Sequence, residues 1–321
     1  MLKASELMAL YRTMLTIRLF EEQVVGMFAR GQVPGLTHAY IGEEAIAAGV
    51  CAALRRDDYI TSTHRGHGHV IARGADLKRM MAELCGKKTG YCKGKGGPMH
   101  IADMSIGILG ANGVVGGGIP VAVGAGLSAK HKGTDRVSVS FFGDAASNTG
   151  SFHESLNLAS VWRLPVVFVC ENNLYGISVG QEKHQAIKDI ADRAVAYAME
   201  GEVVDGMDAV AVFEASKKAV RRARSGQGPT LIECKTYRYR GHHEGDPNMG
   251  TRYRTREEIE AWKRKDPLDR MTELLLSRKA VTKSQLSEIN RDVTEQVKGA
   301  VSFALESPSP EPQELYEEVY V

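Results

Sequence analysis

The chain has 321 residues, of which 43% are hydrophobic and 25% charged, so it can bury a large core and is not an intrinsically disordered protein. Lys and Arg number 41 and Asp and Glu 39, and the formal net charge of +2 gives no field that would favour nucleic acid or a membrane surface. The five cysteines form no C-x-x-C pair and follow no signal peptide, and no apolar run approaches the ~18 residues of a membrane span. We therefore expect free thiols in a soluble, cytoplasmic protein.

Apolar residues recur at helical spacing near the amino terminus, and they predict one long amphipathic helix over residues 5–30. A second helix is expected to begin near Glu43, and residues 59–62 form a short predicted strand. This strand leads directly into residues 63–69, which include three histidines. Residues 86–100 are rich in Lys and Gly without apolar periodicity, so we expect a long ordered loop. Its lysines lack the Gly-Lys-Ser/Thr of a P-loop, and we interpret them as solvated.

The middle of the chain alternates strand-like apolar runs with helical patterns. The predicted strands cover residues 137–142, 166–170 and 230–234, and the predicted helices cover residues 151–162, 187–199 and 209–224. This order is typical of a doubly wound α/β fold with a parallel sheet. Only helical patterns follow from about Asp266, so we expect an α/β domain over residues 1–265 and a C-terminal helical extension with a docking tail over residues 266–321.

The tail begins with a proline-rich spacer over residues 307–312, which excludes a helix there. It ends in an apolar tip formed by Leu315, Tyr316, Val319 and Tyr320. A tip of this kind suits docking on a neighbouring surface, and a frayed terminus is the equal alternative.

Two polar pairs follow consecutive predicted strands, Gly143-Asp144 after the first and Asn172-Asn173 after the second. The carboxyl ends of parallel strands meet at one edge of an open sheet, so Asp144 and Asn173 can converge. A carboxylate, an amide oxygen and a nearby backbone carbonyl are hard ligands that suit Mg²⁺. Either pair alone is more typical of a turn or a helix start, but together they favour a Mg²⁺ site that clamps a diphosphate.

A glycine-rich run over residues 110–120 precedes a helix of small residues, as in a dinucleotide-binding loop. However, no clear strand precedes it, and no acidic residue stands at a strand end about 20 positions later. We therefore disfavour dinucleotide binding.

The Gly143-Asp144 pair, a spacer and Asn172-Asn173 together resemble the thiamine diphosphate fingerprint, in which Gly-Asp-Gly is followed by Asn-Asn. Nearly the whole chain resembles the α subunit of the thiamine-dependent first component of 2-oxo acid dehydrogenase complexes, most closely the acetoin dehydrogenase branch and next the pyruvate dehydrogenase branch. The resemblance implies the thiamine diphosphate-binding α/β fold, with thiamine diphosphate and Mg²⁺ as cofactors. It also implies cleavage of a C–C bond beside a carbonyl, with oxidative transfer of acetyl to a lipoyl group.

The resemblance further implies roles for individual residues. The expected metal ligands are Asp144, the side chain of Asn173 and the backbone carbonyl of Tyr175. The expected diphosphate contacts are Gly143, Ala145, Ala146, His64, Arg65 and Arg238, and the expected contacts of the aminopyrimidine ring are Gly113 and Val115. The residues expected to surround the reactive carbon and exchange protons there are His38, His67 and, foremost, His242. Ala145 stands where the fingerprint has glycine, so a left-handed backbone at that position would be strained.

The resemblance also implies protein partners. In this family the carboxylate that activates the cofactor belongs to a β subunit, so we expect an inactive isolated chain, an α2β2 heterotetramer and a lipoyl-bearing dihydrolipoyl acetyltransferase as partner. Residues 243–245 resemble acetoin-type subunits, no phosphoserine stands at position 243, and Glu244 near the entrance is expected to repel a carboxylate such as pyruvate. The alternatives are a pyruvate dehydrogenase α subunit and, from another class, a non-catalytic nucleotide- or phosphate-binding module.

Overall fold

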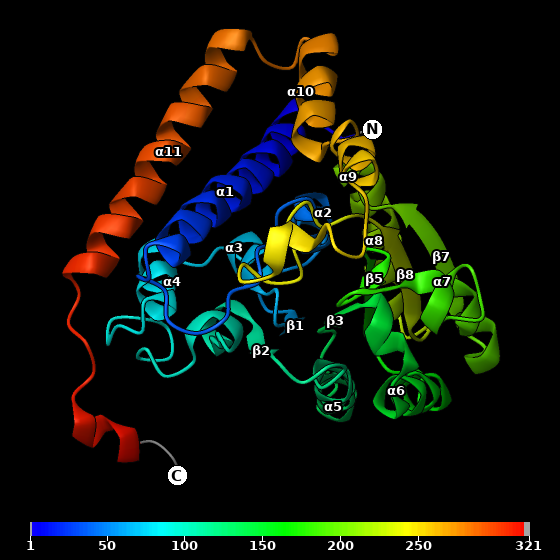
Figure 1. Ribbon diagram of the computed structural model, residues 1–321. Coiled ribbons are helices and arrows are strands. Elements are labelled where there is room, and N and C mark those ends of the chain that lie inside the picture. Colours follow the sequence, from blue (N-terminus) through cyan, green and yellow to red (C-terminus); the bar gives the residue numbers. More distant parts are fainter. Residues whose placement is uncertain (1, 318–321) are drawn as a thin grey trace.

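A computed structural model describes residues 2–317 and places six strands in one parallel sheet of order β2-β1-β3-β4-β8-β7 (Figure 1). The strands are β1 (Tyr59–Thr63), β2 (Ile108–Asn112), β3 (Ser138–Gly143), β4 (Val166–Asn172), β7 (Glu200–Asp205) and β8 (Thr230–Lys235), and a separate pair is formed by β5 (Tyr175–Gly176) and β6 (Val179–Gly180). The sequence predicts β1, β3, β4 and β8, which pair in parallel as expected. The predicted α/β fold class is confirmed.

The sequence does not predict the two edge strands of the sheet. In β7 only Val204 is buried, so this strand has no apolar run to reveal it. The expectation that no strand precedes the glycine-rich run is wrong, because β2 ends at Asn112. The predicted helix over residues 187–199 is wrong in type: it is a 3₁₀-helix, η4 (Ile190–Tyr197), followed closely by β7.

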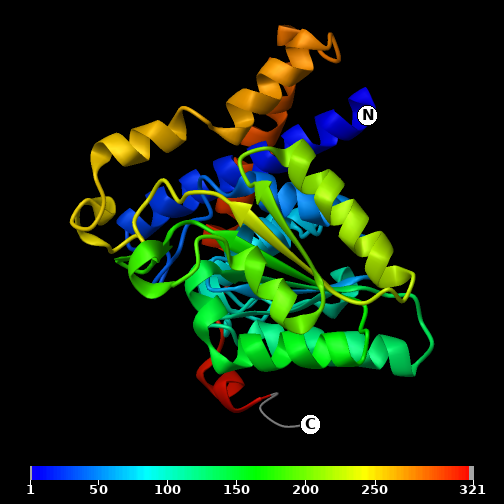
Figure 2. The same cartoon turned by 90° about the vertical axis from the view of Figure 1, so that its right-hand side faces the viewer.

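Helices cover both faces of the sheet, as the doubly wound fold requires (Figures 1 and 2). Val167 and Val169 of β4 pack in the core shared by α1, α2 and α8, whereas Val166 and Phe168 pack against α5 and α6. The α-helices are α1 (Ala4–Ala29), α2 (Glu44–Ala52), α3 (His67–Ala72), α4 (Leu77–Leu84), α5 (Gly118–His131), α6 (Gly150–Val161), α7 (Gln181–His184), α8 (Ala209–Arg224), α9 (Arg256–Lys263), α10 (Pro267–Ser277) and α11 (Lys283–Glu306). The shorter 3₁₀-helices are η1 (Gly97–Met99), η2 (Met104–Ile106), η3 (Asp144–Asn148), η5 (Pro247–Gly250) and η6 (Pro312–Tyr316).

The helical pattern predicted after Asp266 is present as α10 and α11. Both helices contact α1, and α11 also packs along α4 at one side of the molecule (Figure 1). Val293 and Val297 of α11 belong to the same buried cluster as the apolar side of α1. These contacts join the two predicted parts of the chain in one core.

The described part of the tail lies on a loop of its own chain. The Lys88 Nζ lies 2.5 Å from the Glu314 carboxylate, and the Lys88 backbone N–H donates to the Pro308 carbonyl at 3.0 Å. Leu315 and Tyr316 remain exposed, while Val319 and Tyr320 of the predicted tip lie outside the described residues. The tail therefore docks within the chain as far as it is described.

The cysteines are free thiols, as expected, and four of the five are buried. In residues 2–317 no helix has both the length and the apolar character needed to cross a membrane.

The strands bring the predicted site residues to one edge of the sheet. Gly143 pairs with Glu171, and Glu171 pairs with Cys234, so β3, β4 and β8 end at a similar level. The loops that leave β1 and β3 at this edge carry His64 and Asp144. This is the edge at which open α/β sheets bind ligands.

Candidate active site

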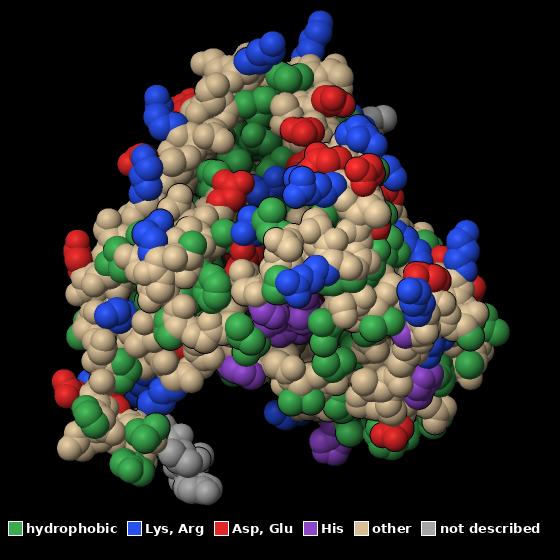
Figure 3. Space-filling model, viewed as in Figure 1, with side chains coloured by type: hydrophobic (Ala, Val, Ile, Leu, Met, Phe, Trp, Pro, Cys, Tyr) green, Lys and Arg blue, Asp and Glu red, His purple; other side chains and the backbone are tan. Residues whose placement is uncertain are grey.

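A cavity of about 560 Å³ lies at the carboxyl ends of the strands. It is lined by all but one of the site residues predicted from the sequence, namely His38, His64, Arg65, Gly113, Val115, Gly143, Asp144, Ala145, Ala146, Asn173, Tyr175, Arg238 and His242. Apolar side chains such as Leu36, Met99 and Ile119 complete its walls. Figure 3 shows histidine side chains gathered near the centre of one face of the molecule.

His67 is the predicted site residue that does not reach the cavity. Its Nδ1 lies 3.0 Å from the Glu21 carboxylate and its Nε2 lies 2.9 Å from the Pro98 carbonyl oxygen, so both ring nitrogens are engaged. Burial opposes a charge on this ring, but the Glu21 carboxylate outweighs burial and raises the pKa of His67. His67 thus links α3 to α1 and to the 97–99 turn, and we do not carry it into the proposed active site.

The three predicted metal ligands line the same cavity. The Asn173 Nδ2 donates a hydrogen bond to Glu43 Oε1 at 2.8 Å, while its buried Oδ1 has no partner among the described residues. The Asp144 side chain is buried, with Oδ2 3.2 Å from the His184 Nε2. The Tyr175 carbonyl accepts a hydrogen bond from Arg238 at 3.1 Å. A carboxylate, a free amide oxygen and a carbonyl are thus available to a cation that prefers oxygen.

Two residues near this oxygen set are not found by sequence reasoning. Glu43 fixes the orientation of the Asn173 amide. Burial raises the pKa of the Glu43 carboxyl to about 7, although the positive charge of Arg65 opposes this shift. The Asp144 carboxylate, 3.2 Å from the His184 Nε2, raises the pKa of His184. Glu43 could have been noticed as the first of two acidic residues before an apolar helix, but no local signal marks His184.

A second layer of hydrogen bonds holds η3, the turn that begins at Asp144. Gln185 donates to the Asp144 carbonyl at 2.9 Å. Arg193 donates to the Ser147 carbonyl at 2.9 Å, to the Asn148 Oδ1 at 2.8 Å and to the Gln185 Oε1 at 2.7 Å. Arg193 does not line the cavity, so it positions the turn from behind.

The predicted diphosphate-binding arginines are buried at the cavity wall and already bind backbone carbonyls. Arg65 donates to the Ala39 carbonyl at 2.6 Å and to the His242 carbonyl at 3.0 Å, and so joins two loops that carry histidines. Arg238 donates hydrogen bonds to the carbonyls of Tyr175 and Ile177, while its buried Nε has no hydrogen-bond partner within residues 2–317. Direct contact of either side chain with a diphosphate stays a prediction.

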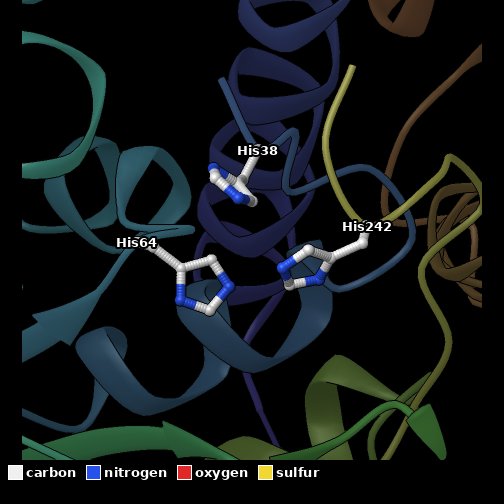
Figure 4. Close-up of side chains that lie close together, drawn as sticks. All are labelled: His38, His64 and His242. Atoms are coloured by element: carbon white, nitrogen blue, oxygen red, sulfur yellow. The ribbon is translucent and has the colours of Figure 1, made fainter. Parts of the chain in front are cut away.

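Three predicted histidines meet in the cavity from three separate loops (Figure 4). The ring centroid of His38 lies 4.7 Å from that of His64 and 5.0 Å from that of His242. Burial, reinforced by the positive charge of Arg65, lowers the pKa of His38 to about 2, that of His64 to about 3 and that of His242 to about 2. Burial and Arg65 thus favour the neutral form of these rings in the unliganded chain.

The backbone at Ala145 is not strained. Ala145 lies within η3 and is not among the non-glycine residues with positive φ in residues 2–317, so the expected left-handed strain is absent. The Ala145 methyl group instead leaves no room for a side chain at residue 176, because a Cβ at Gly176 would lie 2.8 Å from the Ala145 Cβ. Alanine therefore fits this position of the fingerprint.

The expectation that Glu244 repels a carboxylate substrate is wrong. Its side chain is 3% exposed and forms an ion pair with Arg240 at 2.7 Å, and it does not line the cavity. Because Arg240 neutralises it at close range, Glu244 adds no uncompensated negative charge at the entrance.

The comparisons with known proteins agree with this geometry. A family model described as "Dehydrogenase E1 component" matches residues 11–313. The chain belongs to the dehydrogenase E1 component family. It is similar to the α subunit of acetoin:2,6-dichlorophenolindophenol oxidoreductase of Bacillus subtilis (strain 168), with 54% identity over 97% of this chain and 92% of that protein.

This E1 component chain has further relatives that it matches over nearly their whole length. The α subunit of acetoin:2,6-dichlorophenolindophenol oxidoreductase of Cupriavidus necator is 46% identical over 98% of this chain and 94% of that protein. The pyruvate dehydrogenase E1 component α subunit of Porphyra purpurea is 40% identical over 97% of this chain and 91% of that protein. The family and these relatives indicate a thiamine diphosphate-dependent oxidoreductase component.

Proposed function

We propose that this chain is the α subunit of an acetoin dehydrogenase that uses thiamine diphosphate and Mg²⁺. The observation that carries the cofactor assignment is the buried, unpartnered Asn173 Oδ1 on the same cavity as the Asp144 carboxylate. The substrate assignment is supported by the two acetoin oxidoreductase α subunits, which are more similar to the chain than the pyruvate dehydrogenase subunit from Porphyra. That 40% identical relative supports a pyruvate dehydrogenase α subunit as the second candidate.

The residues present fit the proposed cofactor and its metal. Asp144, the Asn173 Oδ1 and the Tyr175 carbonyl would hold Mg²⁺, since all three offer oxygen. The Tyr175 carbonyl has a second lone pair besides the one that accepts from Arg238. When bound, thiamine diphosphate supplies the electron sink that lets a C–C bond beside a carbonyl break.

The small residues of η3 leave backbone groups accessible to a diphosphate. Gly143, Ala145 and Ala146 line the cavity without side chains that would fill it, and Gly113 and Val115 line it from the loop after β2. The chain's contribution to the reaction is thus to bind and orient the cofactor against a partly apolar wall that excludes water.

The histidines are suited to hold or pass protons in this cavity. The Nδ1 atoms of His38 and His242 are buried without partners among the described residues, so each can form a new hydrogen bond there. An anionic ligand would favour the protonated rings and raise their pKa back toward neutrality. In each neutral ring one nitrogen carries a proton, and the hydrogen-bond partner that the ring meets in the cavity determines which nitrogen that is.

The proposal includes a β subunit in an α2β2 heterotetramer and a lipoyl-bearing dihydrolipoyl acetyltransferase that accepts the acetyl group, working in the cytoplasm. Apolar side chains of Val114, Val115 and Ile177 line the cavity yet are more than half exposed, which supports a protein partner that covers them. The relatives are named as α subunits, which supports a partner of a different kind.

The test is calorimetric and thermal titration of the full chain, alone and with its β subunit. We expect stabilisation by thiamine diphosphate with Mg²⁺ but not by NAD or ATP, and loss of this Mg²⁺-dependent binding in Asp144→Ala. Unchanged affinity in that variant would contradict the metal assignment, and stabilisation by ATP alone would favour the nucleotide-binding alternative. Reconstituted α and β subunits should cleave acetoin with a higher kcat/KM than pyruvate, and the reverse order would favour the second candidate.

A further inference from the structure

The rings of three histidines point toward one another in the cavity (Figure 4). One ring nitrogen of each lies within 4.8 Å of the corresponding nitrogens of the other two. We propose that His38, His64 and His242 form a binding site for one divalent transition-metal ion, with Zn²⁺ as the expected ion, separate from the oxygen-lined site proposed for Mg²⁺.

The spacing of the rings is close to that of a metal site. Zn²⁺ binds imidazole nitrogen at ~2.0–2.1 Å in tetrahedral geometry, so its ligand nitrogens lie about 3.4 Å apart. Movements of roughly 1 Å would bring the three nitrogens from within 4.8 Å to this separation. The unpartnered Nδ1 atoms of His38 and His242 make such movement easier, because rotating these rings breaks no hydrogen bond at those atoms.

The ligand chemistry selects the class of ion. Imidazole suits Zn²⁺, Co²⁺, Ni²⁺ and Cu²⁺, whereas Mg²⁺ prefers oxygen and does not compete here.

The nearby arginines shape the site. Arg65 lies near all three rings and Arg238 lies near His64 and His242, and their positive charges oppose the binding of a dication. The Glu43 carboxylate partly offsets the charge of Arg65, as its effect on the Arg65 pKa shows. Three protein ligands leave a fourth position open, where an anion or hydroxide would lower the net charge. We therefore expect a site with three histidines and one exchangeable ligand.

Metal binding at this site would affect the proposed cofactor. His64 is expected at the diphosphate and His38 and His242 near the reactive carbon, so Zn²⁺ and thiamine diphosphate should exclude one another. This consequence rests on the proposed function, whereas binding of the metal alone does not.

The experiment uses Co²⁺ as a spectroscopic substitute for Zn²⁺ in the untagged full chain, without cofactor. We expect one Co²⁺ to bind per chain and to show the visible d–d absorption of a four-coordinate ion with nitrogen ligands. Added Zn²⁺ should displace the Co²⁺ and abolish this absorption. Replacing His38, His64 or His242 by Ala should weaken binding by more than the ~10–100-fold that loss of an outer-shell partner costs. The matched control is His131→Ala, a histidine exposed on α5, which should bind as the parent does.

A further variant keeps the test decisive if an alanine variant does not fold. His242→Cys retains a metal ligand, and its Co²⁺ complex should gain the thiolate charge-transfer absorption that the parent lacks. Absence of saturable Co²⁺ binding in the folded parent, or equal affinity in the parent and a folded alanine variant, would overturn the proposal. Thiolate absorption in the parent would overturn it as well, because a cysteine would then be the ligand.

Discussion

Gly143 lines the cavity, yet its backbone does not require glycine. Its φ is −84°, and a Cβ built there would meet only the Glu171 carbonyl oxygen, at 4.0 Å. We predict that Gly143→Ala changes the free energy of unfolding by less than about 0.5 kcal/mol. It should nevertheless weaken thiamine diphosphate binding about tenfold or more, because the methyl group enters the space expected for the diphosphate, and tenfold corresponds to ~1.4 kcal/mol. Calorimetry and denaturant unfolding measure the two effects separately.

The control for this variant is Gly299→Ala in α11, where no atom lies within 4 Å of the added Cβ. Equal cofactor affinity in the Gly143 and Gly299 variants would place the diphosphate elsewhere.

The buried histidines should make stability depend on pH. In the folded chain burial, followed by Arg65, lowers the pKa of His38 from 6.5 to about 2. Between these values the unfolded chain binds more protons, so stability rises with pH in this range and is lost as the pH falls below 6.5. From pH 7 to pH 5 we expect His38 to account for a loss of about 2 kcal/mol in the free energy of unfolding. Denaturant unfolding in metal-free buffer should show this loss in the parent and a shallower one in His38→Gln.

The comparison variant is His131→Gln, which replaces an exposed imidazole. A parent and a His38→Gln variant that lose stability equally between pH 7 and pH 5 would show that His38 accepts a proton in the folded state.

At the residue scale the sequence predicts side chains that follow strand ends and misses those that reach the site only through packing. Asp144 and Asn173 are found because each follows a strand directly. Glu43 meets Asn173 across 130 positions, and His184 meets Asp144 from a separate short helix, so no local spacing marks either residue. His67 shows the reverse case. Three histidines in one short stretch look alike in sequence, but only His64 lines the cavity, because buried carboxylates hold the other two, Glu21 on α1 next to His67 and Glu171 next to His69.

At the element scale the turn proposed to bind Mg²⁺ depends on η4, which supplies Arg193. This side chain holds the Ser147 carbonyl and the Asn148 and Gln185 side chains, and Gln185 in turn holds the Asp144 carbonyl. We predict that Arg193→Ala weakens Mg²⁺-dependent binding of thiamine diphosphate about tenfold while leaving the chain folded, because the turn loses its support. Arg193→Lys should recover part of the affinity.

The readout is the Mg²⁺ concentration for half-maximal cofactor binding, which a general loss of stability in a folded chain would not shift. Arg221→Ala, an exposed arginine on α8, is the control. Similar Mg²⁺ dependence in the Arg193 and Arg221 variants would remove Arg193 from the support of the site.

The elements themselves are predicted from the sequence where burial forces a pattern. β3, β4 and β8 are buried along nearly their whole length, and their apolar residues, continuous in β4 and interrupted by a few polar residues in β3 and β8, reveal them. The edge strand β7 is largely exposed, and η4 is a 3₁₀-helix whose apolar residues resemble one side of an α-helix. The structure of β7 and η4 depends on the pairing of β7 with β8 and on tertiary packing. Neither can be predicted from the residues of this segment alone.

At the scale of the whole molecule the cavity is incomplete for the proposed reaction. Among the described residues that line it, Asp144 is the only one with a carboxylate, and that group is assigned to the metal. The expected activation of the cofactor needs another carboxylate, so a second protein must bring it. The exposed apolar residues at the mouth, including Val114 and Ile177, lie where such a protein would cover the opening.

We therefore predict that the isolated chain binds thiamine diphosphate with Mg²⁺ but does not turn over acetoin or pyruvate, and that adding the β subunit restores cleavage. The physical reason is the missing carboxylate, because Asp144, the carboxylate that lines the cavity among the described residues, is proposed to bind Mg²⁺. The measurement compares cleavage of both substrates with an artificial electron acceptor, for the isolated chain, the reconstituted assembly and an assembly carrying Asp144→Ala. Turnover by the isolated chain well above that of its own Asp144→Ala variant would mean that this chain supplies the activating group itself.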